Sequence, residues 1–183
     1  MSGIVGDNLA RASGVIASAG GGTILSVKSL KVTDTSSNSG TAPTQISAFD
    51  MSFAPTTSDG KLYFECHICL GIVGETSCAG YFYDVTNSAI IGAYADAAGS
   101  RLRTSWGHFV KNDAYSNTVS FGTWHEPGST DSRDYTIFGN ANASSTMYIN
   151  RNNDNTDSAT MNSSRKASTF TITEYAADTV TLT

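Results

Sequence analysis

The chain has 183 residues, of which 15% are charged, and its formal net charge is −5 at pH 7. This length suits one domain with a sizeable core. Lys and Arg form no cluster longer than Arg165-Lys166, so no nucleic-acid partner is expected. No stretch approaches the roughly 18 to 20 apolar residues of a membrane span, so no membrane partner is expected. The surface must instead consist of Ser, Thr, Asn and Gly, as in β-sandwiches with many turns.

The segment Met1–Gly22 differs in composition from the rest of the chain. It has no basic region followed by an apolar core, so no secretory signal is expected. Its apolar residues include Ile4, Val5, Leu9, Ala12 and Ile16, the last four at helical spacing. Several glycines weaken any helix there, and three of them in a row end the segment. One interpretation is that this segment is disordered. We favour the other, in which it is an attachment arm whose contacts come from Ile4, Val5, Leu9 and Ile16. The β domain then comprises residues 23–183.

The β domain is predicted to contain ten short strands separated by turns. The predicted strands are Thr23–Val32, Gln45–Ala54, Lys61–Gly74, Cys78–Val85, Ala89–Ala95, Arg101–Val110, Thr118–His125, Asp134–Phe138, Thr146–Ile149 and Ser168–Tyr175. Thr33–Thr44 is predicted to be a polar loop and Pro55–Gly60 a turn. No helical stretch of ordinary length intervenes, so the fold class is all-β, an antiparallel sandwich or jelly roll.

The stretch Lys61–Gly74 is the predicted centre of the domain. Residues of alternate positions make one uniformly apolar face, namely Leu62, Phe64, Cys66, Ile68, Leu70 and Ile72. The opposite face is mixed, and glycines stand at both ends. This period of two predicts a long, half-buried strand.

The three cysteines are Cys66, Cys69 and Cys78. Their odd number is not a disulfide framework, and it is typical of a chain made in a reducing cytoplasm. A C-x-x-C pair binds zinc where a tight knuckle turns both sulfurs inward. Inside a strand this spacing places Cys66 and Cys69 on opposite faces, which favours buried structural cysteines. We expect no metal and no cofactor.

Motifs for catalysis are weak. No G-x-S-x-G or H-E-x-x-H motif accompanies His67, His108 or His125. Asp154 and Asp157 suggest glycoside hydrolysis, which needs two carboxylates at a defined distance, but the sequence does not specify the distance between them. The segment Asn150–Asp157 resembles a cation loop, yet it lacks the sixth-position glycine and distal Glu of an EF-hand, which favours a polar surface loop. We therefore expect no enzyme.

Aromatic residues indicate a second possible function, carbohydrate binding, since aromatic rings can stack on sugars. The candidates are Tyr81, Tyr83, Tyr115, Trp106 and Trp124. The alternative is that at least half of them belong to the core or to an interface.

Several segments, in order, resemble one family. They are Ile24–Thr35, Ser52–Phe64, the D-A-A-G-S-R segment Asp96–Arg101, the Y-I-N-R segment within Tyr148–Asp154, Thr156–Ala159 and the closing strand Ser168–Glu174. Together they resemble small β-rich virion proteins of tailed phages, common in marine phages. The continuation Ala176–Thr183 and the cysteine trio depart from the family pattern.

The resemblance implies a phage structural protein with a jelly-roll-like sandwich packed as a homotrimer. Candidate trimer-interface or structural residues are Asp96, Arg101, Arg103, Tyr148, Asn150 and Arg151. Arg101 and Arg103 share a predicted strand face and can pair with Asp96 of the same or a neighbouring subunit. The expected partners are other copies of the chain, other virion proteins through the arm, and host surface glycans.

The expected function is a non-enzymatic virion protein, made in the infected bacterium and displayed on the particle as a short tail or neck fibre that contacts the host. One alternative is a capsid decoration protein on the phage head. Another is a virion-associated glycan-binding or glycan-degrading module, and a third is a soluble carbohydrate-binding module without an assembly role. In the fibre reading, specificity comes from loops such as Asn112–Asn117 and Glu126–Arg133.

Overall fold

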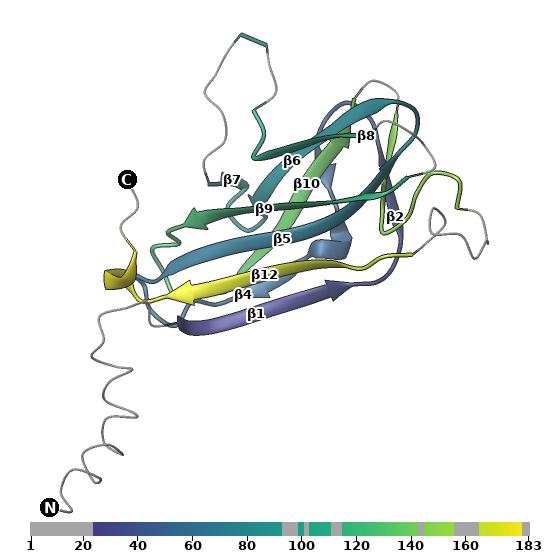
Figure 1. The fold of residues 1–183 in the computed structure, drawn as a ribbon. Coiled ribbons are helices and arrows are strands. Elements are labelled where there is room, and N and C mark those ends of the chain that lie inside the picture. The colour runs from purple at the N-terminus through teal and green to yellow at the C-terminus, as the bar shows by residue number, and fades with distance from the viewer. Residues whose placement is uncertain are drawn as a thin grey trace, which may run out of the picture.

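The structure is a computed structural model that describes residues 24–92, 99–100, 103–110, 115–142, 145–155 and 165–180. These residues form two antiparallel six-stranded sheets, shown in Figure 1. The strands are β1 (Ile24–Val32), β2 (Ser36–Ser39), β3 (Thr44–Gln45), β4 (Met51–Phe53), β5 (Lys61–Ile72), β6 (Thr76–Asp84), β7 (Ala89–Ile91), β8 (Trp106–Val110), β9 (Asn117–His125), β10 (Arg133–Ala141), β11 (Thr146–Ile149) and β12 (Ser168–Tyr175). The helices are the 3-10 turns η1 (Ser47–Phe49) and η3 (Ala177–Thr179). Among the described residues, no helix has the length and apolar character to cross a membrane.

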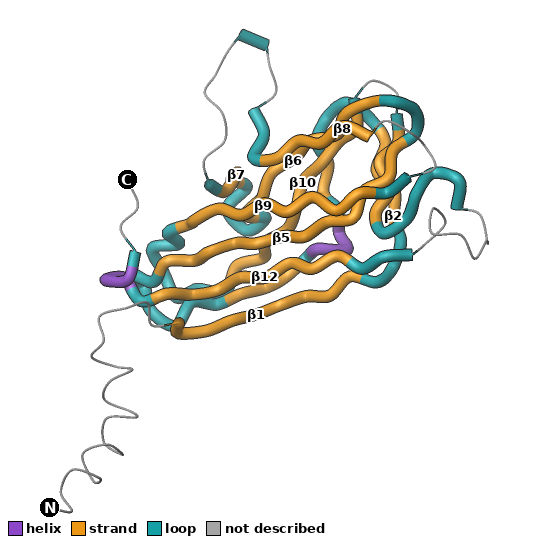
Figure 2. Tube along the Cα trace, in the orientation of Figure 1, coloured by secondary structure: helices purple, strands orange, loops and turns teal. Residues whose placement is uncertain are grey.

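Each sheet is four strands wide, because short strands share the outer positions. In sheet A, β5 lies between β9 and β12, with β11 taking the place of β12 at the far end of β5 and with β1 and β2 as outer strands. In sheet B, β10 and β6 are central, β3 and β4 share one edge, and β7 and β8 share the other. Figure 2 shows the long strands of sheet A running side by side. The predicted all-β, jelly-roll-like antiparallel β-sandwich is confirmed.

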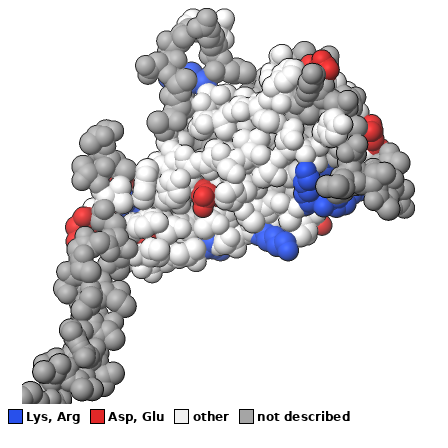
Figure 3. Space-filling view, in the orientation of Figure 1, with Lys and Arg blue, Asp and Glu red and all other residues white. Residues whose placement is uncertain are grey.

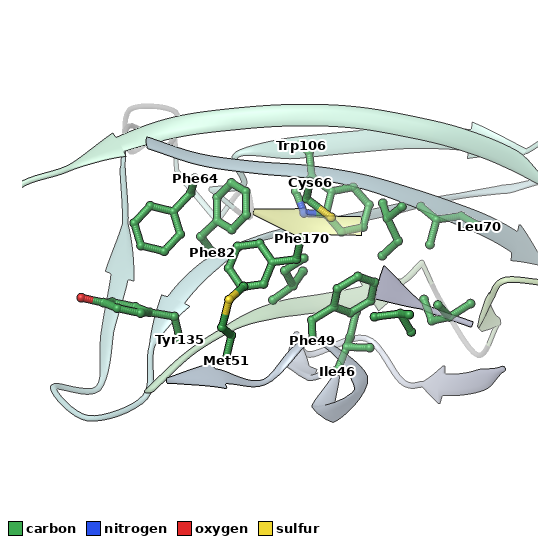
Figure 4. Close-up of a cluster of buried hydrophobic side chains, with 14 of the residues drawn as sticks. Ile46, Phe49, Met51, Phe64, Cys66, Leu70, Phe82, Trp106, Tyr135 and Phe170 are labelled. Atoms are coloured by element: carbon green, nitrogen blue, oxygen red, sulfur yellow. The ribbon is translucent and has the colours of Figure 1, made fainter. Parts of the chain in front are cut away.

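The core lies between the two sheets and is built on β5. All six residues of its predicted apolar face are fully buried, as the alternation requires. Phe64 sits at the centre of an aromatic group, with ring centroids 5.0 Å from Tyr135, 5.6 Å from Phe82 and 6.0 Å from Phe170 (Figure 4). The predicted central strand is confirmed. On the face opposite the core, Cys69 is also fully buried, as predicted for the cysteines.

The predicted single strand 45–54 is wrong. The structure breaks it into β3, η1 and β4. Ile46 and Phe49 are both buried in the core, although a period of two would send residues three apart to opposite faces. The 3-10 turn solves this conflict, since it brings positions i and i+3 to the same side. Phe49, Met51 and Phe53 are buried in the core.

Three further predictions need correction. The predicted loop 33–44 contains β2, which pairs with β11 along its whole length. Strand β7 ends at Ile91, earlier than predicted. Strand β8 starts at Trp106, whose ring packs in the core instead of facing a ligand. A strand such as β2 has no apolar pattern to reveal it, because its side chains are polar and its pairing comes from the backbone.

Candidate functional site

The outer face of sheet A is mainly polar. The strand registers place its side chains in rows that run across the sheet. The rows are Val27–Thr173–Tyr63–Trp124, Ser29–Thr171–Glu65–Gly122 and Lys31–Thr169–His67–Ser120. Figure 3 views this face and shows few charged groups, with one acidic group near its middle and basic groups toward the right end and the lower edge. A mainly polar face of this kind is stable when it is exposed to solvent.

The third row and its neighbour bring together a serine, a histidine and a carboxylate. His67 Nδ1 and Ser120 Oγ are hydrogen bonded at 2.6 Å, and His67 Nε2 lies 3.6 Å from Glu65 Oε1. These residue types resemble a hydrolytic triad. All three side chains are exposed on the open sheet face, whereas activated nucleophiles work in sites that exclude water. We therefore interpret them as a surface polar network.

Three rings form an aromatic corner at one end of the sheet A face. The corner consists of Tyr63, Trp124 and Tyr175, with centroid distances of 4.9 Å for Tyr63–Trp124 and 5.3 Å for Trp124–Tyr175. Tyr63 lies over Gly122, where a methyl group would collide with the tyrosine hydroxyl. The rings remain partly exposed. Sequence reasoning named Trp124 as a candidate, but it did not foresee that three strands bring these rings together.

The outer face of sheet B is apolar and aromatic. Its rows pair Ser77 with Phe109, Ala79 with Gly107, Phe138 with Tyr81, and Tyr83 with Ile90 and Thr136. Phe138 is 5.8 Å from Tyr81 and 4.3 Å from Tyr83 between ring centroids, and Phe109 is 57% exposed. These rows contain no charged side chain. The next row of the same face contains exposed Asp134, opposite Ser52, and polar Asn140 lies opposite Ala79. Burial raises the pKa of Tyr81, and the neighbouring Tyr83 adds to this effect, so Tyr81 is uncharged at neutral pH.

Asn150 is a structural residue at the junction of β11, β1 and β12. It is fully buried with a left-handed φ of 62°. Its Nδ2 donates to the carbonyl oxygens of Val32 at 2.8 Å and Asp34 at 2.9 Å, and its Oδ1 accepts from Ser168 Oγ at 2.6 Å. Ser168 Oγ in turn accepts from the backbone amide of Cys69 at 2.9 Å. Asn150 therefore joins four segments within one copy of the chain.

The other candidate residues fall into two groups. Arg151 Cζ lies 3.7 Å from the ring centroid of Tyr148, a cation–π contact on the outer side of β11. Arg103 is exposed ahead of β8. The remaining candidates lie outside the described residues: Asp96, Arg101, Ile4, Val5, Leu9 and Ile16. The pairing of Arg101 and Arg103 with Asp96 and the role of the arm remain proposals.

The cysteines do not form one cluster. Cys66 belongs to the core between the sheets, Cys69 is buried on the opposite side of β5, and Cys78 lies in sheet B. All three are free and buried. Burial raises the pKa of each thiol, in the case of Cys78 to about 12. They therefore act as apolar packing groups.

The sequence analysis did not predict two buried carboxylates, those of Glu174 and Asp84. Glu174 accepts hydrogen bonds from the amides of Thr56 at 2.8 Å and Thr57 at 3.1 Å and from Ser26 Oγ at 2.7 Å, which fastens the 55–60 turn to sheet A. Asp84 is the partner of Arg133. A signal for Glu174 existed, because in β12 it occupies the same alternate positions as Phe170 and Ile172.

The Asp84 group also holds the 126–133 loop. Arg133 Nη1 lies 3.3 Å from Asp84 Oδ2, and Arg133 Nη2 donates to the Pro127 carbonyl at 2.6 Å and to Ser129 Oγ at 3.1 Å. Burial lowers the pKa of the neighbouring His125 and raises the pKa of Tyr135 to about 12. This group is therefore a fixed support for the loop. Residues 112–114 of the other predicted specificity loop, and residues 156 and 157 of the predicted cation loop, lie outside the described residues.

No family model and no curated protein matches the chain. Among solved structures, the chain is similar to that of the infectious bursal disease virus Gx strain, with 12% identity and a TM-score of 0.36 over 83% of this chain and 38% of that chain. It is also similar to the VP2 subviral particle of infectious bursal disease virus, with 10% identity and a TM-score of 0.35 over 82% of this chain and 39% of that chain. Similarities this distant assign neither a family nor a function. The chain spans less than half the length of these viral chains.

Proposed function

We propose that this chain is a non-enzymatic structural protein of a tailed-phage virion, displayed on the particle as a short tail or neck fibre that contacts the host. The ordered resemblance of residues 24–174 to phage virion proteins supports this assignment. The observation that carries it is the contrast between the two outer faces of the sandwich, one mainly polar and one with rows of aromatic side chains that hold no charge.

The outer face of sheet B suits packing against further copies of the chain. Burying an apolar surface stabilises association, whereas burying an unpaired charge opposes it. Phe109, Tyr81 and Phe138 offer apolar area, and their rows hold no charge that would repel an identical face. Exposed contiguous apolar patches on soluble proteins commonly mark interaction sites. A homotrimer about a three-fold axis is the closed assembly that we propose, with the polar face of sheet A outward.

The experiment is sedimentation of the purified full-length chain and of single variants. We expect a mass three times the 19.2 kDa chain. Tyr81→Ser and Phe138→Ser should shift this mass toward the monomer. Tyr63→Ser, the matched change on sheet A, should keep the trimer. A monomer at all concentrations for the unchanged chain would refute self-assembly through this face.

Host contact is the second part of the proposal. Tyr115 is 50% exposed beside the β8–β9 connection, and the Arg133 contacts hold the 126–133 loop in place. An exposed aromatic ring can hold a host glycan by stacking, and the ordered 126–133 loop, at the opposite end of β9, offers hydrogen bonds at a separate site. The test is binding of virions to host cells in competition with the purified protein, compared with its Tyr115→Ala variant.

The position on the particle distinguishes the fibre from the alternative of a capsid decoration protein. Gold-labelled antibody against the chain, imaged on intact virions, should mark the tail or neck. Label spread over the head would move the assignment to decoration. Absence of label from virions would refute both virion roles.

A further inference from the structure

The aromatic corner lies beside the start of the 126–133 loop. Trp124 is the second-last residue of β9 and lies opposite Tyr63 in the β5–β9 ladder. Glu126 begins the loop directly after β9 ends. The rings and the first residue of the loop therefore meet at one end of the sheet A face.

An ion pair borders the rings on the loop side. Lys61 lies opposite Tyr175 in the β12–β5 ladder, and its Nζ is 3.4 Å from Oε1 of Glu126. The same ammonium group donates to the carbonyl oxygen of Val180. An ammonium group has three donors, so these contacts leave one of them. The Glu126 side chain is 58% exposed, so its carboxylate has acceptor capacity for a ligand.

A second carboxylate borders the rings on the opposite side. Glu65 follows Tyr63 by two positions in β5, so both side chains lie on the outer face of sheet A. The Glu65 side chain is 49% exposed, and its Oε1 lies 3.6 Å from His67 Nε2. Tyr63 reaches over Gly122, which lies opposite Glu65 and has no side chain to fill that place. The Tyr63 ring therefore leans across toward β9 and leaves its other side partly exposed.

The charges around the corner disfavour an anionic ligand. Carboxylates gather at this end of the sandwich, where two flank the rings and two line the pocket next to Ala176: Glu65, Glu126, Asp59 and Asp178. The cations of Lys61 and Arg133 are paired with Glu126 and with buried Asp84. An anion would therefore meet net repulsion here.

A cation held between the rings does not fit either. The centroid distances of 4.9 Å for Tyr63–Trp124 and 5.3 Å for Trp124–Tyr175 are those of rings in direct contact, so an ammonium group has no room between neighbouring rings. The rings instead form an aromatic platform bordered by hydrogen-bonding groups. A neutral sugar matches this combination, because its C–H face stacks on an aromatic ring while its hydroxyls bind polar groups.

We propose that the aromatic corner, together with Glu126 and Lys61, binds a neutral hexose unit of a host surface glycan. The C–H face of the sugar stacks on Trp124 and Tyr63. Neighbouring hydroxyls donate to the Glu126 carboxylate and accept from the Lys61 ammonium group.

The site is largely formed before a ligand arrives. Arg133 donates to the Pro127 carbonyl and to Ser129 Oγ, which holds the loop behind Glu126 in place. A preorganised site loses less conformational entropy on binding. The inference rests on the host contact proposed above and names a second site for it, at the opposite end of β9 from Tyr115.

Trp124 makes the proposal measurable. The chain has two tryptophans, and the other, Trp106, is buried in the core, so added sugar should change mainly the emission of Trp124. The probes are neutral hexasaccharides of glucose, mannose, galactose and N-acetylglucosamine, each titrated into the purified full-length protein. We expect saturable binding of at least one of them. Hexagalacturonate, an anionic hexasaccharide, should not bind.

Calorimetry with the best-bound sugar locates the site. Trp124→Ala should weaken binding about tenfold, because the stacking ring is lost, and Trp124→Phe should restore most of the affinity. Glu126→Ala should weaken binding about threefold to tenfold through the loss of a hydrogen bond. The matched control Tyr148→Ala removes a partly exposed ring of β11 in the same sheet and should leave the affinity unchanged. Should Trp124→Ala not fold, Glu126→Ala provides the same test on an exposed side chain.

Equal affinities of Trp124→Ala and the unchanged chain would overturn the proposal. Failure of every neutral hexasaccharide to bind, or binding of choline in their place, would overturn it as well. Binding lost in Tyr115→Ala but kept in Trp124→Ala would contradict this site and leave the proposed host contact standing. Sugar binding that depends on Trp124, in a protein that does not compete with virions for host cells, would refute the host contact alone.

Discussion

Ser168 Oγ donates a hydrogen bond of 2.6 Å to Asn150 Oδ1, at the point where β11 ends and the path toward β12 starts. The same asparagine amide donates to two carbonyl oxygens at the end of β1. This pair is the place where three strands of sheet A and the loops between them are tied together. It explains why a polar side chain with a left-handed backbone is kept fully buried.

Replacing Asn150 by alanine should destabilise the chain by about 2–4 kcal/mol, because it leaves buried carbonyl groups unpaired and strains a backbone with positive φ. Asn150→Gly loses the same hydrogen bonds but tolerates the backbone, so its loss should be smaller. Urea unfolding of both variants provides the measurement. Equal losses would show that the backbone conformation contributes nothing.

Removing one partner of the Asp84–Arg133 pair should destabilise the fold by about 3 kcal/mol, because Asp84 is 2% exposed at its side chain and would be left as a buried charge. Arg133→Met should therefore cost more than the double variant Asp84→Asn/Arg133→Met. A double-mutant cycle from chemical unfolding measures the difference. Additive losses would contradict the coupling.

Acid should destabilise the fold through His125. Burial lowers the pKa of this imidazole below its ordinary value of 6.5, Arg133 lowers it further, and Asp84 and Glu126 oppose the shift. The unfolded chain then binds a proton near pH 6.5 that the native state binds only at lower pH. The free energy of unfolding should therefore fall as the pH drops below 6.5, by at most about 1.4 kcal/mol per pH unit.

Thermal unfolding between pH 8 and pH 5 measures this dependence. His125→Gln should flatten the pH dependence, while His67→Gln, a change on the exposed sheet face, should retain it. A His125→Gln variant as pH-sensitive as the unchanged chain would exclude this histidine as the cause.

The three cysteines should resist thiol reagents in the folded chain. All are buried, and burial raises the pKa of each thiol, so little reactive thiolate forms at pH 8. Ellman's reagent should detect almost no thiol in the native protein and three per chain in denaturant. Fast reaction of one cysteine in buffer would place that thiol at the surface.

The sequence pattern alone predicted the strands in which buried and exposed residues alternate regularly. The alternation in β5 identified the core face correctly, and β11 and β12 were predicted with their observed bounds. The i,i+3 spacing also separated Cys66 and Cys69 onto opposite sides of β5. These features depend on the two-residue period of a strand, which a short stretch of sequence already shows.

The tertiary structure decided what depends on partners distant in the chain. Ser36–Ser39 is a strand only because β11 supplies its backbone pairing, and the 45–54 segment breaks because Ile46 and Phe49 both find room in the core. Glu174 is buried because residues over 100 positions away satisfy it, and Asp84 combines local hydrogen bonds from Asn87 with the distant guanidinium of Arg133. The aromatic corner and the aromatic rows of sheet B likewise arise from strand register. Cross-strand register sets which side chains become neighbours, and no local pattern contains that information.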